Sequence, residues 1–212
     1  VHNGNINGID TTYFSPEALP KQKSALRVEL GIAPEDFVFV FVGRIVSDKG
    51  MTELAQAMQT LPANTKLILV VNQEPELDPL APETAHYFVT SSQVISVGFQ
   101  SDVRPYLLAA DALVFPSYRE GFPNVVMQAG AMGLPSIVTD INGCNEIIHE
   151  GENGIIIPPR NSEALANAMQ TFIDNPLRTD EMAKNSRPLI VSRYQQEDLW
   201  HAIKEMYLGL GK

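Results

Sequence analysis

The chain has 212 residues, of which 44 % are hydrophobic and 19 % are charged, and its formal net charge is −10. This size and composition suit a globular domain with a sizeable core. The acidic balance argues against nucleic acid as a partner, because phosphate backbones are bound by dense patches of Lys and Arg. A bound anion must therefore be held by a few focused cations and by backbone amides.

Cysteine and histidine usage excludes two further classes of protein. Cys144 is the only cysteine, so an intramolecular disulfide framework and a multi-cysteine metal site are ruled out. The four histidines show no metal-ligand spacing, and we expect no metal. The apolar runs are too short to span a bilayer, and no secretory leader is visible, so the expected compartment is the cytoplasm.

Strand and helix patterns alternate along the chain. Strands are predicted over residues 37–42, 66–71, 94–97, 111–115, 136–139 and 155–157. Helices are predicted over residues 21–30, 52–61, 102–110, 122–132, 145–148 and 161–173, followed by two more with a break near Arg187-Pro188. The proline-rich residues 72–85 are predicted as a loop. This alternation predicts an α/β fold, a Rossmann-like three-layer parallel sheet with right-handed crossovers.

Polar residues gather where one buried strand ends and a helix begins, between Phe115 and Asp140. Ser117, Arg119 and Glu120 follow the strand, and no amphipathic pattern explains them. In open α/β sheets, ligands bind outside the carboxyl ends of the strands, and a helix N-terminus favours anions. This stretch therefore predicts a site for a phosphorylated ligand.

A basic loop follows the strongest predicted strand. Arg44 and Lys49 lie in it, flanked by Gly43 and Gly50. Two cations beside flexible glycines at a strand's carboxyl end suit a diphosphate, with a forked contact from Arg and a point charge from Lys. The pattern fits a solvated surface loop equally well, and it is neither a G-x-G-x-x-G fingerprint nor a Walker loop.

Glu120 and the backbone after it form the second candidate. Its carboxylate could accept hydrogen bonds from sugar hydroxyls, and the amides of residues 121–125, except that of Pro123, could meet phosphate or sugar oxygens. The alternative is an acid that only complements the helix dipole. Cys144 is interpreted as a small packed residue and not as a nucleophile.

Several short motifs follow one another along nearly the whole chain. They are Asn7-Gly8-Ile9-Asp10, Phe41-Val42-Gly43-Arg44, Asp48-Lys49-Gly50, Pro116-Ser117, Glu120-Gly121-Phe122-Pro123-Asn124, Gly133-Leu134-Pro135 and Glu152-Asn153-Gly154. In this order and spacing they resemble the C-terminal, nucleotide-sugar-binding domain of glycosyltransferase family 4, the retaining "group 1" transferases of the GT-B fold. Thr139-Asp140 with Gly143-Cys144-Asn145-Glu146 is similar to the branch that builds bacterial surface polysaccharides and lipid-linked glycans.

The resemblance implies a role for each candidate. Arg44 and Lys49 would hold the donor diphosphate, Glu120 would contact the donor sugar, and these three would be the catalytic residues. The full set implied for donor binding is Gly43, Arg44, Lys49, Gly98, Phe99, Glu120, Gly121, Phe122, Asn124, Val125 and Gln128. The resemblance also implies a reaction that retains anomeric configuration, with no metal and no protein nucleophile.

The chain departs from the family pattern at two points. Gln128 stands where the family has a second Glu, and Gln loses the charge-assisted contact to a hydroxyl. The resemblance also implies an N-terminal, acceptor-binding domain, which we expect to lie outside these 212 residues. Residues 1–20 then resemble the interdomain crossing, residues 21–192 the nucleotide-sugar-binding domain, and residues 193–212 a helix that packs toward the absent domain, with part of its Trp200 and Tyr207 face left exposed.

The resemblance thus implies the donor-binding domain of an enzyme that transfers a hexose or N-acetylhexosamine from a nucleoside diphosphate sugar. UDP is the expected nucleotide, and a glycan or lipid-linked glycan is the expected acceptor, at the inner face of the cytoplasmic membrane in the full-length protein. Without the acceptor domain this chain would be inactive alone. Two alternatives stay open: a non-catalytic nucleotide-sugar-binding module, which Gln128 favours, and a sugar-nucleotide epimerase on the same fold, which would need an acid/base constellation.

Overall fold

The computed structural model describes residues 8–72 and 79–210. Within these residues, six parallel strands form one sheet in the order β3-β2-β1-β4-β5-β6. The strands are β1 (Phe37–Arg44), β2 (Thr65–Asn72), β3 (Val94–Gly98), β4 (Ala112–Phe115), β5 (Ser136–Thr139) and β6 (Gly154–Ile157). The predicted α/β fold with a Rossmann-like parallel sheet is therefore confirmed.

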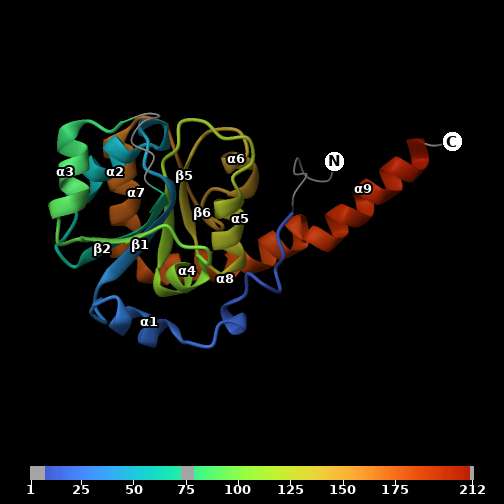
Figure 1. The fold of residues 1–212 in the computed structure, drawn as a ribbon, viewed down its shortest axis with the longest axis horizontal. Helices are drawn as coiled ribbons and strands as arrows, with labels where there is room; N and C mark the ends of the chain where they lie inside the picture. The colour runs from blue at the N-terminus through green and yellow to red at the C-terminus, as the bar shows by residue number, and fades with distance from the viewer. Residues whose placement is uncertain (1–7, 73–78, 211–212) are drawn as a thin grey trace.

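Helices cover both faces of the sheet and make it the middle of three layers (Figure 1). On one face, α3 (Pro82–Thr90) and α7 (Ser162–Asp174) pack on α2 (Met51–Met58). On the other face, α1 (Lys23–Glu29) packs on α4 (Arg104–Ala109), and α5 (Asn124–Ala131) packs on α8 (Pro176–Tyr194). The remaining elements are η2 (Pro16–Ala18), η3 (Ser47–Lys49), α6 (Cys144–Ile147) and α9 (Gln196–Leu210).

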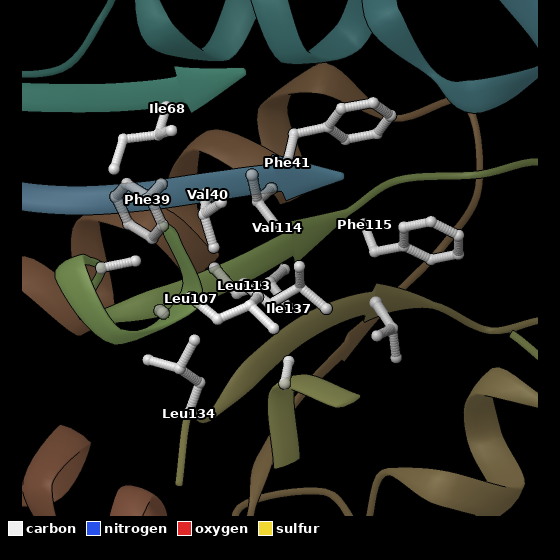
Figure 2. Close-up of a cluster of buried hydrophobic side chains, with 14 of the residues drawn as sticks. Phe39, Val40, Phe41, Ile68, Leu107, Leu113, Val114, Phe115, Leu134 and Ile137 are labelled. Carbon is white, nitrogen blue, oxygen red and sulfur yellow. The ribbon is translucent and has the colours of Figure 1, made fainter. Parts of the chain in front are cut away.

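The core lies on both sides of the central strands. In β1, Val38 through Phe41 are all fully buried, as expected for a parallel strand covered on both faces. Figure 2 shows Phe39, Val40 and Phe41 of β1 beside side chains of β2, β4, β5 and α4. The rings of Phe41 and Phe115 stack with centroids 6.3 Å apart. Burial of these apolar chains holds β1 and β4 side by side.

Two predictions that relied on proline were wrong. The loop predicted over residues 72–85 ends earlier, because α3 begins at Pro82; residues 73–78 lie outside the described residues. Proline is tolerated at the first helical position, where its missing N–H would have no partner. The break predicted near Arg187-Pro188 is absent, because α8 continues through Pro188 to Tyr194.

The helix continues because packing against α5 outweighs the lost backbone hydrogen bond at Pro188. Ile190 is fully buried, and Gly130 of α5 leaves room for it, since a Cβ there would lie 2.5 Å from Ile190 Cγ1. The chain turns instead at Gln195, which forms a parallel bridge with Ile9. A contact between distant parts of the sequence therefore ends this helix.

The last helix extends away from the body of the domain (Figure 1). Leu199 near its start is buried, whereas Trp200, Tyr207 and Leu208 are 57 %, 67 % and 59 % exposed. The predicted exposure of the Trp200 and Tyr207 face is confirmed. None of the helices in the described ranges has the length and apolar character needed to cross a bilayer.

Candidate functional site

The carboxyl ends of β1, β2 and β4 border a pocket of about 380 Å³. The chain moves outward from β1 to β2 and β3, then crosses back to place β4 on the other side of β1. Open α/β sheets bind ligands at such a topological switch point. The pocket is lined by Val42, Gly43, Arg44, Lys49, Val70, Val71, Phe99, Gln100, Val103, Phe115, Glu120, Pro123, Asn124 and Val125.

An ion pair joins the loop after β1 to the loop after β4. Lys49 Nζ lies 2.6 Å from Glu120 Oε1, and the two side chains are only 13 % and 17 % exposed. This shielding from solvent makes the attraction stronger than that of a surface pair. Arg44, at the end of β1, lines the same pocket. Two cations and one carboxylate therefore meet at the switch point.

Two buried hydroxyl groups support Glu120 from the sheet side. Thr139 Oγ1 in β5 donates to the carbonyl oxygen of Ser117, and Ser117 Oγ donates to Glu120 Oε1 at 2.8 Å. Both hydroxyl-bearing side chains are buried. Glu120 Oε1 thus accepts from Lys49 and from Ser117, while Oε2 makes no hydrogen bond to any residue that the structure describes.

A glycine brings the β5–α6 loop against the site loop. Gly143 has φ +77°, which side-chain-bearing residues rarely adopt. A Cβ at this position would lie 2.4 Å from the Gly121 carbonyl oxygen and 2.9 Å from Phe122 Cα. The site loop therefore depends on the absence of a side chain at Gly143.

Tyr118 attaches the site loop to the structure around α2. Its N–H donates to Asp48 O at 2.9 Å, and its hydroxyl donates to Glu53 Oε2 at 2.6 Å. Burial, with Glu53 as the second cause, raises the pKa of Tyr118, so the phenol stays protonated and remains a donor. The Arg160 guanidinium lies 4.5 Å from the centre of the ring. These contacts fix the loop on the side away from Thr139.

Cys144 is packed close to the ion pair. Its side chain is fully buried. Burial, with a smaller contribution from Glu120 and an opposing one from Lys49, raises the pKa of the thiol to about 12. A thiol with this pKa is neutral at physiological pH and is a poor nucleophile. Its position agrees with the interpretation as a packed residue.

The pocket brings together most of the residues proposed for donor binding. Gly43, Arg44, Lys49, Phe99, Glu120, Asn124 and Val125 line it. Gly98, Gly121, Phe122 and Gln128 do not. The Phe122 ring packs on Tyr194 of α8, with ring centroids 5.5 Å apart. Gln128 is half-buried on α5, one helical turn after Asn124.

Some pocket residues were not predicted from the sequence. Gln100 and Val103 line the pocket from the connection between β3 and α4, and Pro123 lines it from the start of α5. The position of each directly after a strand or before a helix was a signal that could have identified it. Ser117 was singled out as a polar residue, but its contact with Glu120 was not predicted.

The site offers cations and amides for an anion more clearly than ligands for a metal. In residues 8–72 and 79–210, no group of three or more His, Cys, Asp or Glu side chains is arranged to hold a metal ion. The positive end of α5 lies at the pocket, because Asn124 and Val125 line it and form the first helical turn. The arrangement suits a diphosphate with a hydroxyl-bearing group attached.

Comparison with curated proteins finds relatives in surface polysaccharide synthesis. A lipopolysaccharide core biosynthesis glycosyltransferase, LpsE of Rhizobium meliloti (strain 1021), is 31 % identical over 186 residues, which cover 87 % of this chain and 52 % of the relative. The capsular polysaccharide biosynthesis glycosyltransferase CapM of Staphylococcus aureus is 29 % identical over 177 residues, which cover 82 % of this chain and 46 % of CapM. The chain spans about half the length of these relatives.

Solved structures share the fold. Anabaena Alr3699/HepE in complex with UDP-glucose superposes with a TM-score of 0.86 at 26 % identity, over 95 % of this chain and 56 % of that one. The C-terminal domain of the group 1 family protein LpcC from Francisella tularensis has a TM-score of 0.75 at 24 % identity, over 89 % of this chain and 99 % of that domain. The second likeness concerns the fold alone.

A family comparison matches residues 22–188 to "Glycosyl transferases group 1". The match covers most of the chain, including both loops that carry Lys49 and Glu120. The chain therefore belongs to the group 1 glycosyltransferase family and has the fold of the C-terminal half of its GT-B members.

Proposed function

We propose that this chain is the donor-binding domain of a retaining glycosyltransferase and that the pocket takes a nucleoside diphosphate hexose or N-acetylhexosamine. The observation that carries the proposal is the convergence of Arg44, Lys49 and Glu120 at the switch-point pocket. Cations suit the diphosphate, and a carboxylate suits sugar hydroxyls. A pocket built this way can bind the diphosphate and the sugar of one ligand through different side chains.

The same residues can assist departure of the nucleotide. When the bond between sugar and diphosphate breaks, negative charge develops on the leaving phosphate. Lys49, Arg44 and the N-terminus of α5 line the pocket and would stabilise that charge. We assign no protein nucleophile, and we propose that the acceptor attacks from the face that the nucleotide leaves. The sugar would keep its anomeric configuration.

UDP is the nucleotide that we propose. Support comes from the Anabaena HepE structure, which is described as a complex with UDP-glucose and has a TM-score of 0.86 against this chain. Phe99, beside Gly98 at the end of β3, lines the pocket and is 72 % exposed, so its ring is available to a nucleobase. The α5 residues Asn124, Val125 and Gln128 and the amides near Gly121 would meet the sugar and phosphates.

The acceptor is proposed to bind outside these 212 residues. This chain spans about half the length of LpsE and CapM, whose described roles are in lipopolysaccharide core and capsular polysaccharide synthesis. We propose a glycan or lipid-linked glycan as acceptor, and a cytoplasmic enzyme that works at the inner face of the membrane. In this proposal residues 1–20 lead from the acceptor domain and residues 21–192 bind the donor. The last helix, α9, packs toward the acceptor domain. The chain alone does not transfer sugar.

Calorimetric titration with UDP, GDP and ADP tests the proposal. We expect UDP to bind, and the Arg44→Ala/Lys49→Ala double variant to bind it at least roughly tenfold more weakly, because charge-assisted contacts are lost. The matched control is Arg178→Ala/Lys184→Ala, which removes one Arg and one Lys from exposed positions of α8. Failure of all three nucleotides to bind at millimolar concentration would contradict the proposal, as would equal effects of the two double variants.

A non-catalytic nucleotide-sugar-binding module remains the second candidate, and Gln128 is the observation that favours it. An amide at this position makes a weaker contact with a hydroxyl than a carboxylate does. Joining the chain to an acceptor domain and assaying transfer separates the two candidates. Donor binding without transfer in the Gln128 protein, with transfer in Gln128→Glu, would favour the module.

A further inference from the structure

Ser117 does not line the pocket, but its hydroxyl contacts the carboxylate that we propose for the donor sugar. Its side chain is 0 % exposed, and its Oγ lies 2.8 Å from Glu120 Oε1. We propose that Ser117 is a positioning residue that determines which oxygen of Glu120 meets the donor sugar. This inference rests on the proposed function and adds a residue and an orientation to it.

The Ser117 hydroxyl has one proton to donate and three acceptors in reach. Glu120 Oε1 lies at 2.8 Å, the carbonyl oxygen of Arg119 at 3.3 Å and that of Asp48 at 3.4 Å. The shortest contact is also the one to a charged acceptor, so the proton points to Glu120. The other two carbonyls are fallback acceptors at distances typical of weaker hydrogen bonds.

This hydrogen bond leaves the two oxygens of Glu120 in different states. Oε1 accepts from Ser117 and from Lys49 Nζ, which is 2.6 Å away. Oε2 accepts from none of the described residues. An ionised carboxylate accepts hydrogen bonds and donates none. Oε2 is therefore the oxygen that accepts from a sugar hydroxyl, while Lys49 keeps further N–H groups for the diphosphate.

The hydroxyl itself is anchored in the sheet. Thr139 Oγ1 in β5 donates to the carbonyl oxygen of Ser117, and Thr139 is 1 % exposed. A rigid strand thus fixes the residue that orients Glu120. Cys144, a second buried side chain near Glu120, offers only a weak S–H donor. Among these buried side chains, Ser117 alone can hold the carboxylate by a strong hydrogen bond.

Dissociation constants for UDP and for UDP-sugars test this role, because Glu120 is assigned to the sugar and not to the nucleotide. The probes are UDP, UDP-glucose, UDP-galactose and UDP-N-acetylglucosamine, titrated into the wild-type chain, Ser117→Ala and Ser117→Cys. For the UDP-sugar that binds the wild type most tightly, we expect both variants to bind roughly tenfold more weakly, the effect of one hydrogen bond to a charged group. UDP affinity should change by less than about twofold.

Two comparisons separate positioning from packing. Ser117→Cys keeps the site filled with a slightly larger side chain and replaces the strong O–H donor by a weak S–H donor, so it remains informative if Ser117→Ala destabilises the fold. Cys144→Ala removes a fully buried side chain near Glu120 without removing a hydrogen bond to it, and it should weaken UDP and UDP-sugar equally or not at all. Thermal denaturation of each variant confirms that the titrated protein is folded.

Several results would overturn the inference. Equal weakening of UDP and UDP-sugar binding would assign Glu120 to the nucleotide or Ser117 to general packing. Wild-type affinity in Ser117→Cys would show that volume matters and the hydrogen bond does not. UDP binding with no binding of any UDP-sugar would contradict the role of Glu120. Failure of UDP to bind the wild type would overturn the proposed function and this inference together. If UDP binds the wild type and the Ser117 variants equally, and the variants show no selective loss of UDP-sugar affinity, only the inference is overturned.

Discussion

At the scale of single residues, the pocket combines a charged pair with neutral groups packed behind it. Lys49 and Glu120 carry the charges, and Ser117, Thr139 and Cys144 lie buried on the sheet side. These three buried side chains place no negative charge against Glu120 as long as the Cys144 thiol is protonated. The state of Cys144 is therefore important, because a thiolate there would repel Glu120.

Titration of Cys144 should make the fold less stable at alkaline pH. Burial raises the pKa of the thiol from 9.0 to about 12 in the folded chain. Between these pH values the unfolded chain has released the proton and the folded chain still binds it, so stability falls as pH rises. Comparing urea unfolding at pH 8 and pH 10, the wild type should lose roughly 1 kcal/mol more than Cys144→Ala.

An alkylation assay provides the control for this prediction. The folded wild type should react with iodoacetamide at pH 8 much more slowly than the urea-unfolded chain, because the thiol is buried and protonated. Equal reaction rates, or the same pH dependence of stability in wild type and Cys144→Ala, would contradict the assigned pKa.

Sequence patterns identified the candidate residues but not the contacts between them. Lys49 and Glu120 each follow a strand, and this position was visible in the sequence. Their 2.6 Å ion pair could not be predicted, because it depends on β1 and β4 being neighbours in the sheet, and strand order is decided by how the crossovers pack. Ser117 was visible only as an unexplained polar residue for the same reason.

At the scale of elements, the site loop between β4 and α5 is held by its neighbours, and Gly143 provides the sharpest test. Gly143 and Gly133 have nearly the same positive φ, +77° and +78°, so alanine is strained at both, and Gly143, with ψ −43°, also lies outside the left-handed helical region. A Cβ at Gly143 would lie 2.4 Å from the Gly121 carbonyl oxygen, whereas a Cβ at Gly133 meets nothing within 4 Å.

Gly143→Ala should therefore displace the site loop, and Gly133→Ala should not. We expect Gly133→Ala to lower the free energy of unfolding by about 1 kcal/mol with UDP binding unchanged. Gly143→Ala should cost about 2 kcal/mol or more and weaken UDP binding. Urea unfolding and calorimetry measure both quantities. Equal losses in the two variants would show that the contact with Gly121 is unimportant.

Arg187 links three elements through backbone carbonyl groups. Its guanidinium donates to Thr11 O at 2.9 Å, to Phe14 O at 2.8 Å and to Ala131 O at the end of α5. One side chain of α8 thus holds the segment before η2 and the helix that starts at the pocket. The break predicted at Arg187-Pro188 was wrong because these contacts help to hold the helix in place at this point. Their partners are far away in the sequence, so local patterns could not reveal them.

Replacing Arg187 should loosen this junction. Arg187→Gln should lower the free energy of unfolding by about 2 kcal/mol, because three carbonyl groups lose a charged donor. Amide hydrogen exchange in residues 9–14 should become faster than in the wild type. Arg178→Gln, an exposed position on the same helix, is the control and should change neither quantity. Unchanged exchange in Arg187→Gln would mean that Ile9 and its bridge to Gln195 hold the segment alone.

At the scale of the whole molecule, the sheet and the helices on its two faces form three layers, and α9 lies outside these layers (Figure 1). Periodicity predicted the parallel sheet because buried strands and amphipathic helices have local signatures. The direction of α9 has no local signature, since it follows from the turn at Gln195 and its bridge to Ile9. The helix leaves the three-layer body and carries apolar side chains into solvent (Figure 1).

Trp200 reports directly on this helix, because it is the only tryptophan in the sequence. Its side chain is 57 % exposed, so at low protein concentration its emission should be red-shifted and readily quenched by iodide. A second copy or an acceptor domain covering the Trp200 and Tyr207 face would shift the emission to the blue and reduce quenching. Dilution distinguishes these cases, since a shift caused by self-association disappears with falling concentration and a shift within one chain does not. A blue-shifted, unquenched emission that is independent of concentration would mean that α9 folds back onto the domain and that the face has no room for a partner.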